Sequence, residues 1–89
     1  MSDIAFTIHI FKEGGSYVAY TPELDLSSCG GTADEARKNI WDAVQGFLKT
    51  SEEMGTLNEV LEEGGYRREG EKWLSPEFIS LDRLTLSFK

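Results

Sequence analysis

The chain has 89 residues, 39% of them hydrophobic, including five Phe, three Tyr and two Trp. This length suits a single domain over residues 1–89, and the composition excludes a chain that is disordered throughout. The formal net charge is −7 and no basic cluster exceeds Arg67-Arg68, so we expect no direct contact with nucleic acid or anionic membranes.

The N-terminal third of the chain predicts three strands. In residues 4–11 every second side chain is apolar, the pattern of a strand with one buried face, here formed by Ile4, Phe6, Ile8 and Ile10. Gly14-Gly15 suits a tight hairpin turn, and residues 16–20 read as the returning strand. Pro22 stops that strand because it has no amide donor. Residues 27–30 then favour a third strand at the sheet edge.

The middle of the chain predicts two capped helices. The four residues from Thr32 form a capping box, in which Thr and Glu side chains bond to the backbone of the first turn. Apolar residues recur at helical spacing from there until the helix ends near residues 53–55. A second capping box at residues 56–59 opens a short helix, which Gly64-Gly65 ends by allowing a left-handed cap.

The C-terminal third has a weaker pattern. Residues 66–75 are compatible with a loose hairpin around Gly70. Alternation returns in residues 78–88 and predicts a last strand with an apolar face made by Leu84, Leu86 and Phe88. Together these elements favour an α+β domain, in which a small antiparallel or mixed sheet carries helices on one face.

The residues offer no catalytic or metal-binding constellation. The single histidine and single cysteine, His9 and Cys29, cannot assemble a zinc site. The first two predicted strands contain no carboxylate for two-metal hydrolysis. Cys29 precedes Gly30-Gly31 and a helix start, where a thiol can be activated, but the turn into the helix explains these glycines more simply. We therefore expect no enzyme, no cofactor and no metal.

The chain carries no feature of export. A lone cysteine cannot close an internal disulfide. No secretion signal or apolar run of membrane-spanning length is present. We therefore expect a cytoplasmic protein.

Several aromatic residues allow two interpretations. Trp41 lies at the edge of the apolar stripe of the predicted helix, and Tyr17 and Tyr20 lie on opposite faces of the second strand. Such residues either widen the core or belong to an association surface, where Trp and Tyr are enriched. A small strand-rich chain has a thin core that favours recruitment of a second copy, so we expect a homodimer or higher oligomer.

Residues 17–39 resemble the HicB-like antitoxin family. The matching pattern is a strand ending in tyrosine, then Pro-Glu-Leu, a glycine and a helix opened by Thr-x-x-Glu-Ala, here Tyr20, Pro22-Glu23-Leu24, Gly31, Thr32 and Glu35-Ala36. The glycine hairpin before this stretch and residues 55–61 after it also fit. The resemblance implies a β-β-β-α-β sheet like a partial RNase H fold without its active site.

The resemblance also implies a function. Such domains bind and neutralise small basic HicA-type toxins, which are mRNA-cleaving ribonucleases, and the acidic composition suits that partner. Many members add a C-terminal DNA-binding domain and carry Pro-Gly-Cys after the leucine; here residues 25–28 differ and the last element is a predicted strand. We therefore expect the short, stand-alone form, acting by occlusion. The partner-binding residues expected are Tyr17, Tyr20, Glu23, Asp25 and Trp41.

One alternative function stays open. The chain would then be a solitary HicB-like scaffold or small-ligand-binding domain with no toxin partner. The sequence does not decide between the two, because no residue pattern names the ligand.

Overall fold

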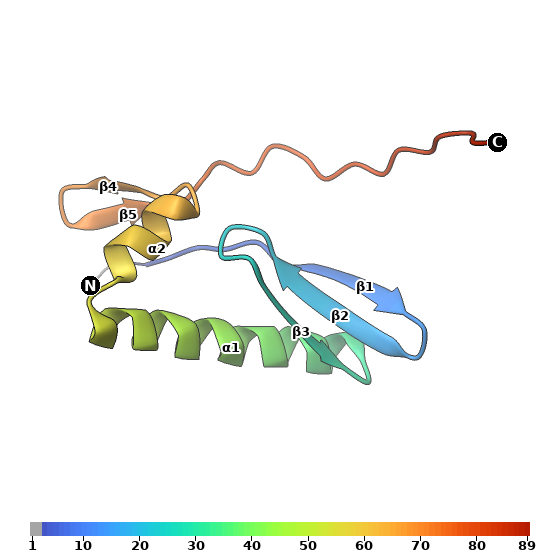
Figure 1. The fold of residues 1–89 in the computed structure, drawn as a ribbon, viewed down its shortest axis with the longest axis horizontal. Helices are drawn as coiled ribbons and strands as arrows, with labels where there is room; N and C mark the ends of the chain where they lie inside the picture. Colours follow the sequence, from blue (N-terminus) through green and yellow to red (C-terminus); the bar gives the residue numbers. More distant parts are fainter. Residues whose placement is uncertain (1–2) are drawn as a thin grey trace.

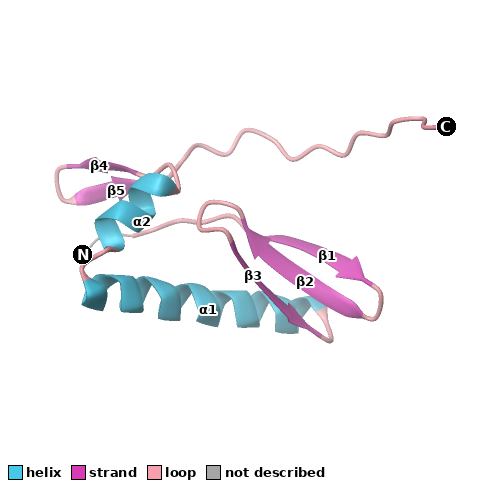
Figure 2. Cartoon of the chain, in the orientation of Figure 1, coloured by secondary structure: helices cyan, strands magenta, loops and turns pink. Residues whose placement is uncertain are grey.

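A three-stranded antiparallel sheet and one long helix form the frame of the fold (Figure 1). The computed structural model describes residues 3–89. The strands β1 (His9–Glu13), β2 (Ser16–Thr21) and β3 (Leu26–Gly30) lie in the order β1-β2-β3. Helix α1 (Ala33–Met54) runs along one side of this sheet (Figure 2). The α+β class and the main helix on one face are thus confirmed.

Strand β1 begins later than the sequence pattern predicts. It pairs with β2 from His9 opposite Tyr20 to Glu13 opposite Ser16, whereas a strand was expected over residues 4–11. The reason lies in β2, which ends at Thr21 and is followed by a proline without an amide hydrogen. Residues 4–8 therefore have no neighbouring strand. Their apolar side chains still pack against the core, as predicted, through Ile4, Phe6 and Ile8.

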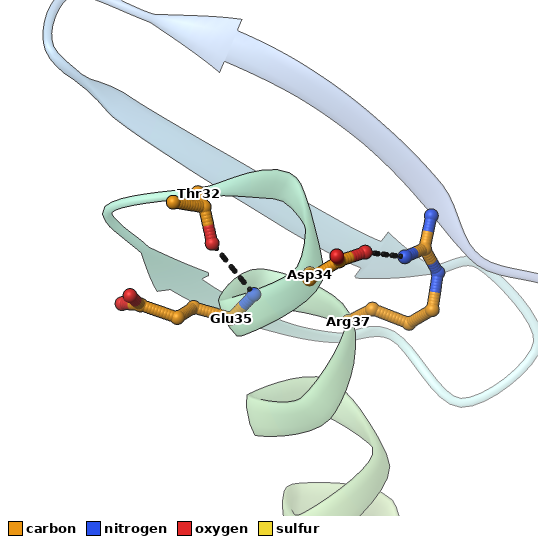
Figure 3. Close-up of polar contacts among 4 residues, drawn as sticks. All are labelled: Thr32, Asp34, Glu35 and Arg37. Atoms are coloured by element: carbon orange, nitrogen blue, oxygen red, sulfur yellow. Dashed lines mark hydrogen bonds and ion pairs between the residues drawn. The ribbon is translucent and has the colours of Figure 1, made fainter.

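Helix α1 is capped at both ends by the residues that the sequence indicates. The Glu35 amide donates to Thr32 Oγ1 at 3.0 Å (Figure 3). The glutamate side chain of the box accepts at 3.1 Å from the Gly31 amide, one residue before the threonine. At the other end Gly55 takes a left-handed φ of 77° and closes the helix. The helix therefore has the predicted extent.

The core lies between α1, the sheet and the segment that follows α1. On the helix, Ala36, Ile40 and Val44 are buried at the four-residue spacing of a single face. The other buried apolar residues come from β2, from the turn after it and from the region after α1, namely Ala19, Leu24, Leu61 and Tyr66.

Helix α2 (Leu57–Glu63) forms where the sequence predicts it, but its N-cap differs from the prediction. The Thr56 hydroxyl makes no cap hydrogen bond to α2, and it lies 3.4 Å from the Ser51 carbonyl oxygen of α1 instead. The predicted left-handed end at the Gly64-Gly65 pair is confirmed by Gly65, whose φ is 91°, while Gly64 has an ordinary φ of −79°. Gly64 is required for another reason, since a Cβ there would lie 2.3 Å from the Glu23 carbonyl oxygen.

The chain then forms the loose hairpin predicted around Gly70. Strand β4 (Arg67–Glu69) pairs with β5 (Lys72–Leu74), and Gly70 has a φ of 64° in the turn between them. This hairpin is a separate two-stranded sheet. It lies beyond the end of the main sheet that is remote from the β1–β2 turn (Figure 1).

The C-terminal strand predicted over residues 78–88 is wrong. Residues 75–89 form no helix or strand and leave β5 as an extended segment (Figure 1). Alternation makes a segment suitable for a sheet, but a strand also needs a neighbour to accept its hydrogen bonds. We call residues 78–88 the tail.

Candidate interaction surface

The two faces of the main sheet have different surroundings. The register aligns Ile10 with Ala19 and Ala19 with Ser28, and Ala19 is fully buried toward α1. Side chains alternate along strands, so the neighbouring rows point away from α1. Within the described residues, α1 is the element with extensive contacts to this sheet. We call the opposite side the open face; it consists of His9, Phe11, Glu13, Ser16, Val18, Tyr20, Ser27 and Cys29.

The open face combines apolar rings with negative charge. Phe11 is 43% exposed and lies opposite Val18 in the register. The His9 and Tyr20 rings meet edge to face with centroids 6.2 Å apart. None of the open-face residues is Lys or Arg, and Glu13 lies at the hairpin end. A centre of aromatic and aliphatic groups with charge at its border is the usual make-up of a protein interface.

Asp25 extends this negative border at the other end of the face. It lies in the turn between β2 and β3 with a left-handed φ of 53°, a conformation that Asp tolerates better than most residues. Its carboxylate accepts a 2.9 Å hydrogen bond from the Tyr20 hydroxyl. This hydrogen bond, together with burial and the nearby charge, raises the pKa of Tyr20 above its ordinary value. The structure thus brings two of the five predicted site residues together.

Glu23 lies in the same turn, but its side chain points toward Thr7 and Thr21. Its carboxylate accepts from the Thr7 amide at 3.0 Å, the Thr7 hydroxyl at 2.7 Å and the Thr21 hydroxyl at 3.2 Å. Burial alone would raise the pKa of this carboxyl, but the hydrogen bonds from Thr7 and Thr21 outweigh it, and the pKa of Glu23 is lowered. Glu23 therefore fastens residues 4–8 to the end of β2.

Tyr17 and Trp41 lie away from the open face. Tyr17 shares the α1 side of β2 with Ala19, packs against the core, and has the Lys12 ammonium 5.6 Å from its ring centroid. Trp41 is 53% exposed on α1 and stacks on Phe6 with centroids 5.8 Å apart. The five predicted residues therefore form no single cluster.

Cys29 belongs to the open face, where it lies opposite Val18. Its side chain is exposed, and its backbone carbonyl accepts a 2.7 Å hydrogen bond from the Asn39 side chain of α1. In the part of the chain that the structure describes, no three His, Cys, Asp or Glu residues are grouped as a metal site would require.

Sequence reasoning did not select Phe11 and Val18 as candidate site residues. The signal was present, because alternation places Phe11 and His9 opposite the buried isoleucine row. What the alternation did not indicate is that, among the described residues, no helix or strand packs on this second face. That depends on where α2 and the β4–β5 hairpin lie in three dimensions (Figure 1).

Comparisons of the chain with models of protein families, with characterised proteins and with solved structures return no match. The resemblance to HicB-like antitoxins therefore stays a prediction from the residues quoted above. Within residues 3–89, none of the helices has both the length and the apolar character that crossing a membrane requires.

Proposed function

We propose that this chain is a HicB-like antitoxin-type domain, which neutralises a small basic HicA-type mRNA-cleaving toxin by covering it. The domain is proposed to act in the cytoplasm and to catalyse no reaction itself. The observation that carries this proposal is the open face, an apolar centre on which no described helix or strand packs, bordered by carboxylates and free of Lys and Arg.

The electrostatics support a basic partner. The net charge of −7 attracts a cationic protein over long range. On the open face, Glu13 and Asp25 flank Phe11 and Tyr20 from opposite ends. Charged borders of this kind guide association and orient the partner, while the aromatic centre supplies the buried contact.

The architecture also suits the proposal. A three-stranded antiparallel sheet followed by a helix on one face is the first part of the β-β-β-α-β arrangement that the resemblance implies. In a partial RNase H-like fold, predicted strands without carboxylates would form a binding surface and no active site. The strand side chains here are apolar or hydroxyl-bearing near the centre of the sheet, in keeping with a surface that binds.

The test mixes the full chain with a purified HicA-type toxin encoded beside it. We expect a stable complex and a loss of RNA cleavage as the chain is titrated to an equimolar amount. Phe11→Ser should weaken this protection by at least about tenfold, because it removes an exposed aromatic group from the proposed centre. RNA cleavage that continues at saturating concentrations of the chain would refute the proposal.

A pair of matched variants separates the open face from overall charge. Glu13→Lys and Glu53→Lys change the net charge equally, but Glu13 borders the open face and Glu53 lies exposed near the end of α1. The first should weaken toxin binding strongly and the second only slightly. Equal effects would show that the open face is not the binding surface.

A further inference from the structure

The tail is the most apolar exposed part of the molecule. Six of its large apolar side chains are between 58% and 91% exposed, namely Phe78, Ile79, Leu81, Leu84, Leu86 and Phe88. The three most exposed of them, Leu84, Leu86 and Phe88, alternate with polar residues and share one side of the extended chain. A segment of this pattern has the properties of a strand that pairs with the edge of a sheet.

An edge suited to the tail is present at β1. Among the described strands, β1 lies at one border of the sheet and pairs with β2 alone. The other border, β3, is the strand most closely packed against α1. Unpaired backbone amides and carbonyls along an edge strand are a template for a further strand.

The tail runs beside β1 but is separated from it by open space. One cavity of about 440 Å³ lies between residues 5–7 and residues 75–78, and another of about 490 Å³ lies between residues 8–11 and residues 81–83. The second cavity is lined by four consecutive residues of β1 and the segment before it, so it lies at the strand edge and not over one face. Both chain segments advance in the same direction, so the tail is parallel to β1 (Figure 1).

We propose that two copies of this chain exchange their tails, each tail inserting as an antiparallel strand between the β1 strand and the tail of the other copy. A tail that is parallel to its own β1 becomes antiparallel to the β1 of a copy related by a twofold axis perpendicular to the strands. The resulting sheet has the order β3-β2-β1-tail-tail-β1-β2-β3, in which the two central strands come from different copies. Every neighbouring pair in it is antiparallel, and the contact is self-complementary as a twofold dimer requires.

Two observations favour a second copy over the chain's own β1 as the neighbour of the tail. Pairing within one chain would be parallel, which is slightly less stable per residue. The end of the tail also extends past the β1–β2 turn (Figure 1), where its own sheet offers no strand. In the exchanged arrangement the other tail covers this part.

The size of the contact is sufficient for a stable dimer. Each copy contributes its tail and the edge formed by β1 and the preceding residues, about twenty residues in all, which matches the roughly 20–30 residues per side of a specific interface. The contact needs no toxin, so its test and the test of the proposed function can fail independently.

The first experiment measures the mass of the full chain in solution over a range of concentrations. We expect twice the 10.0 kDa of one chain. The double variant Leu84→Asp with Leu86→Asp should raise the dimer dissociation constant at least about tenfold, while the helical part of its circular dichroism spectrum stays unchanged. The control, Thr85→Asp with Ser87→Asp, adds equal charge to the polar side of the tail and should remain a dimer. A monomeric wild type, or an apolar-side variant that dimerises normally, would overturn the exchange.

The second experiment locates the tail in the wild-type chain. In a mixed sample, half of the copies carry labelled leucine methyl groups and the other half carry labelled backbone amides. We expect nuclear Overhauser contacts from Leu84 and Leu86 methyls to β1 amides of the differently labelled copies. If the contacts appear only in a second sample, in which every copy carries both labels, the tail lies on its own sheet. If they appear between copies only after toxin addition, the exchange depends on the toxin. Either result would contradict the exchange.

Discussion

Glu23 shows how one residue can be expected at a binding surface and yet hold the fold together. The sequence places it two residues before Asp25, in the turn after β2. The structure directs the two carboxylates differently: Asp25 bonds to Tyr20 at the open face, whereas Glu23 accepts three hydrogen bonds from Thr7 and Thr21. Its backbone carbonyl also lies against Gly64, beyond α2. Glu23 therefore connects three segments that are distant in sequence.

The variant Glu23→Gln should lower the free energy of unfolding by about 1 kcal/mol near neutral pH. The neutral amide keeps the shape but loses charge-assisted hydrogen bonds, and partial solvent exposure keeps the loss modest. The lowered pKa of Glu23 means that its contribution is present above the ordinary glutamate pKa and is lost as the pH falls through the folded-state pKa.

Urea unfolding of wild type and Glu23→Gln checks this expectation. The difference between the two proteins should shrink in acid, where Glu23 becomes protonated. Glu59→Gln, a change of an exposed carboxylate on α2, serves as the control and should have little effect. A difference that persists unchanged in acid would contradict the role given to the charge.

Tyr66 is the second residue that fastens the N-terminal segment. Its side chain is 2% exposed, and its hydroxyl donates a hydrogen bond to the Ala5 carbonyl. Burial, with a smaller contribution from the nearby Glu23 carboxylate, raises the pKa of Tyr66 to about 12. The neutral phenol is therefore the form that the fold favours.

Alkaline unfolding should depend on Tyr66. A raised folded-state pKa gives stability that is fully present below the ordinary tyrosine pKa of 10.0 and is lost as the pH rises to about 12. Tyr66→Phe should cost about 1 kcal/mol near neutral pH through the lost hydrogen bond, and should flatten the fall of stability with pH in that window. Urea unfolding across the window measures it, with Tyr17→Phe as control. An unchanged pH slope in Tyr66→Phe would refute the assignment.

The two helices differ in how they begin, although the sequence predicts the same cap for both. Thr32→Ala should lower the free energy of unfolding by about 1 kcal/mol, because it removes the acceptor of the Glu35 amide. Thr56→Ala should cost less than about 0.5 kcal/mol, because its hydroxyl does not cap α2. Thermal or urea unfolding compares the two variants directly. Equal losses would show that the capping pattern, and not the observed hydrogen bond, determines stability.

Local signals predicted the elements that depend on local contacts. Helix α1, its Gly55 end, the β1–β2 turn and the hairpin around Gly70 follow from residues within or beside each element. The start of β1 depends on where β2 ends, and the tail forms no strand because it has no paired neighbour. The residues within these two segments give no indication of either condition. Alternation correctly assigned Tyr17 and Tyr20 to opposite faces of the second strand. It did not show that the Glu23 side chain turns inward to Thr7, because that contact joins residues that are distant in sequence.

The whole molecule has one covered sheet face, one open face and an acidic surface, and these properties predict how association depends on salt. The rate constant for association with the proposed basic toxin should fall by about tenfold or more from low to high ionic strength, because screening shortens the reach of the −7 charge. Lys12→Glu should raise the low-salt rate and Glu13→Lys should lower it. Stopped-flow association kinetics measure these rates. A rate independent of salt would argue against a basic partner.

The turn at Gly70 offers a place to attach a reporter. A Cβ built at this glycine would meet no atom within 4 Å, and the turn lies at the opposite end of the molecule from the β1–β2 turn and the C-terminus (Figure 1). Exposed turns of this kind tolerate inserted residues. A short fluorescent tag placed after Gly70, with flexible glycines on both sides, would leave the open face and the tail unmodified. Energy transfer between differently tagged copies would then follow the proposed subunit exchange in real time, while a separately labelled candidate toxin would test binding at the open face.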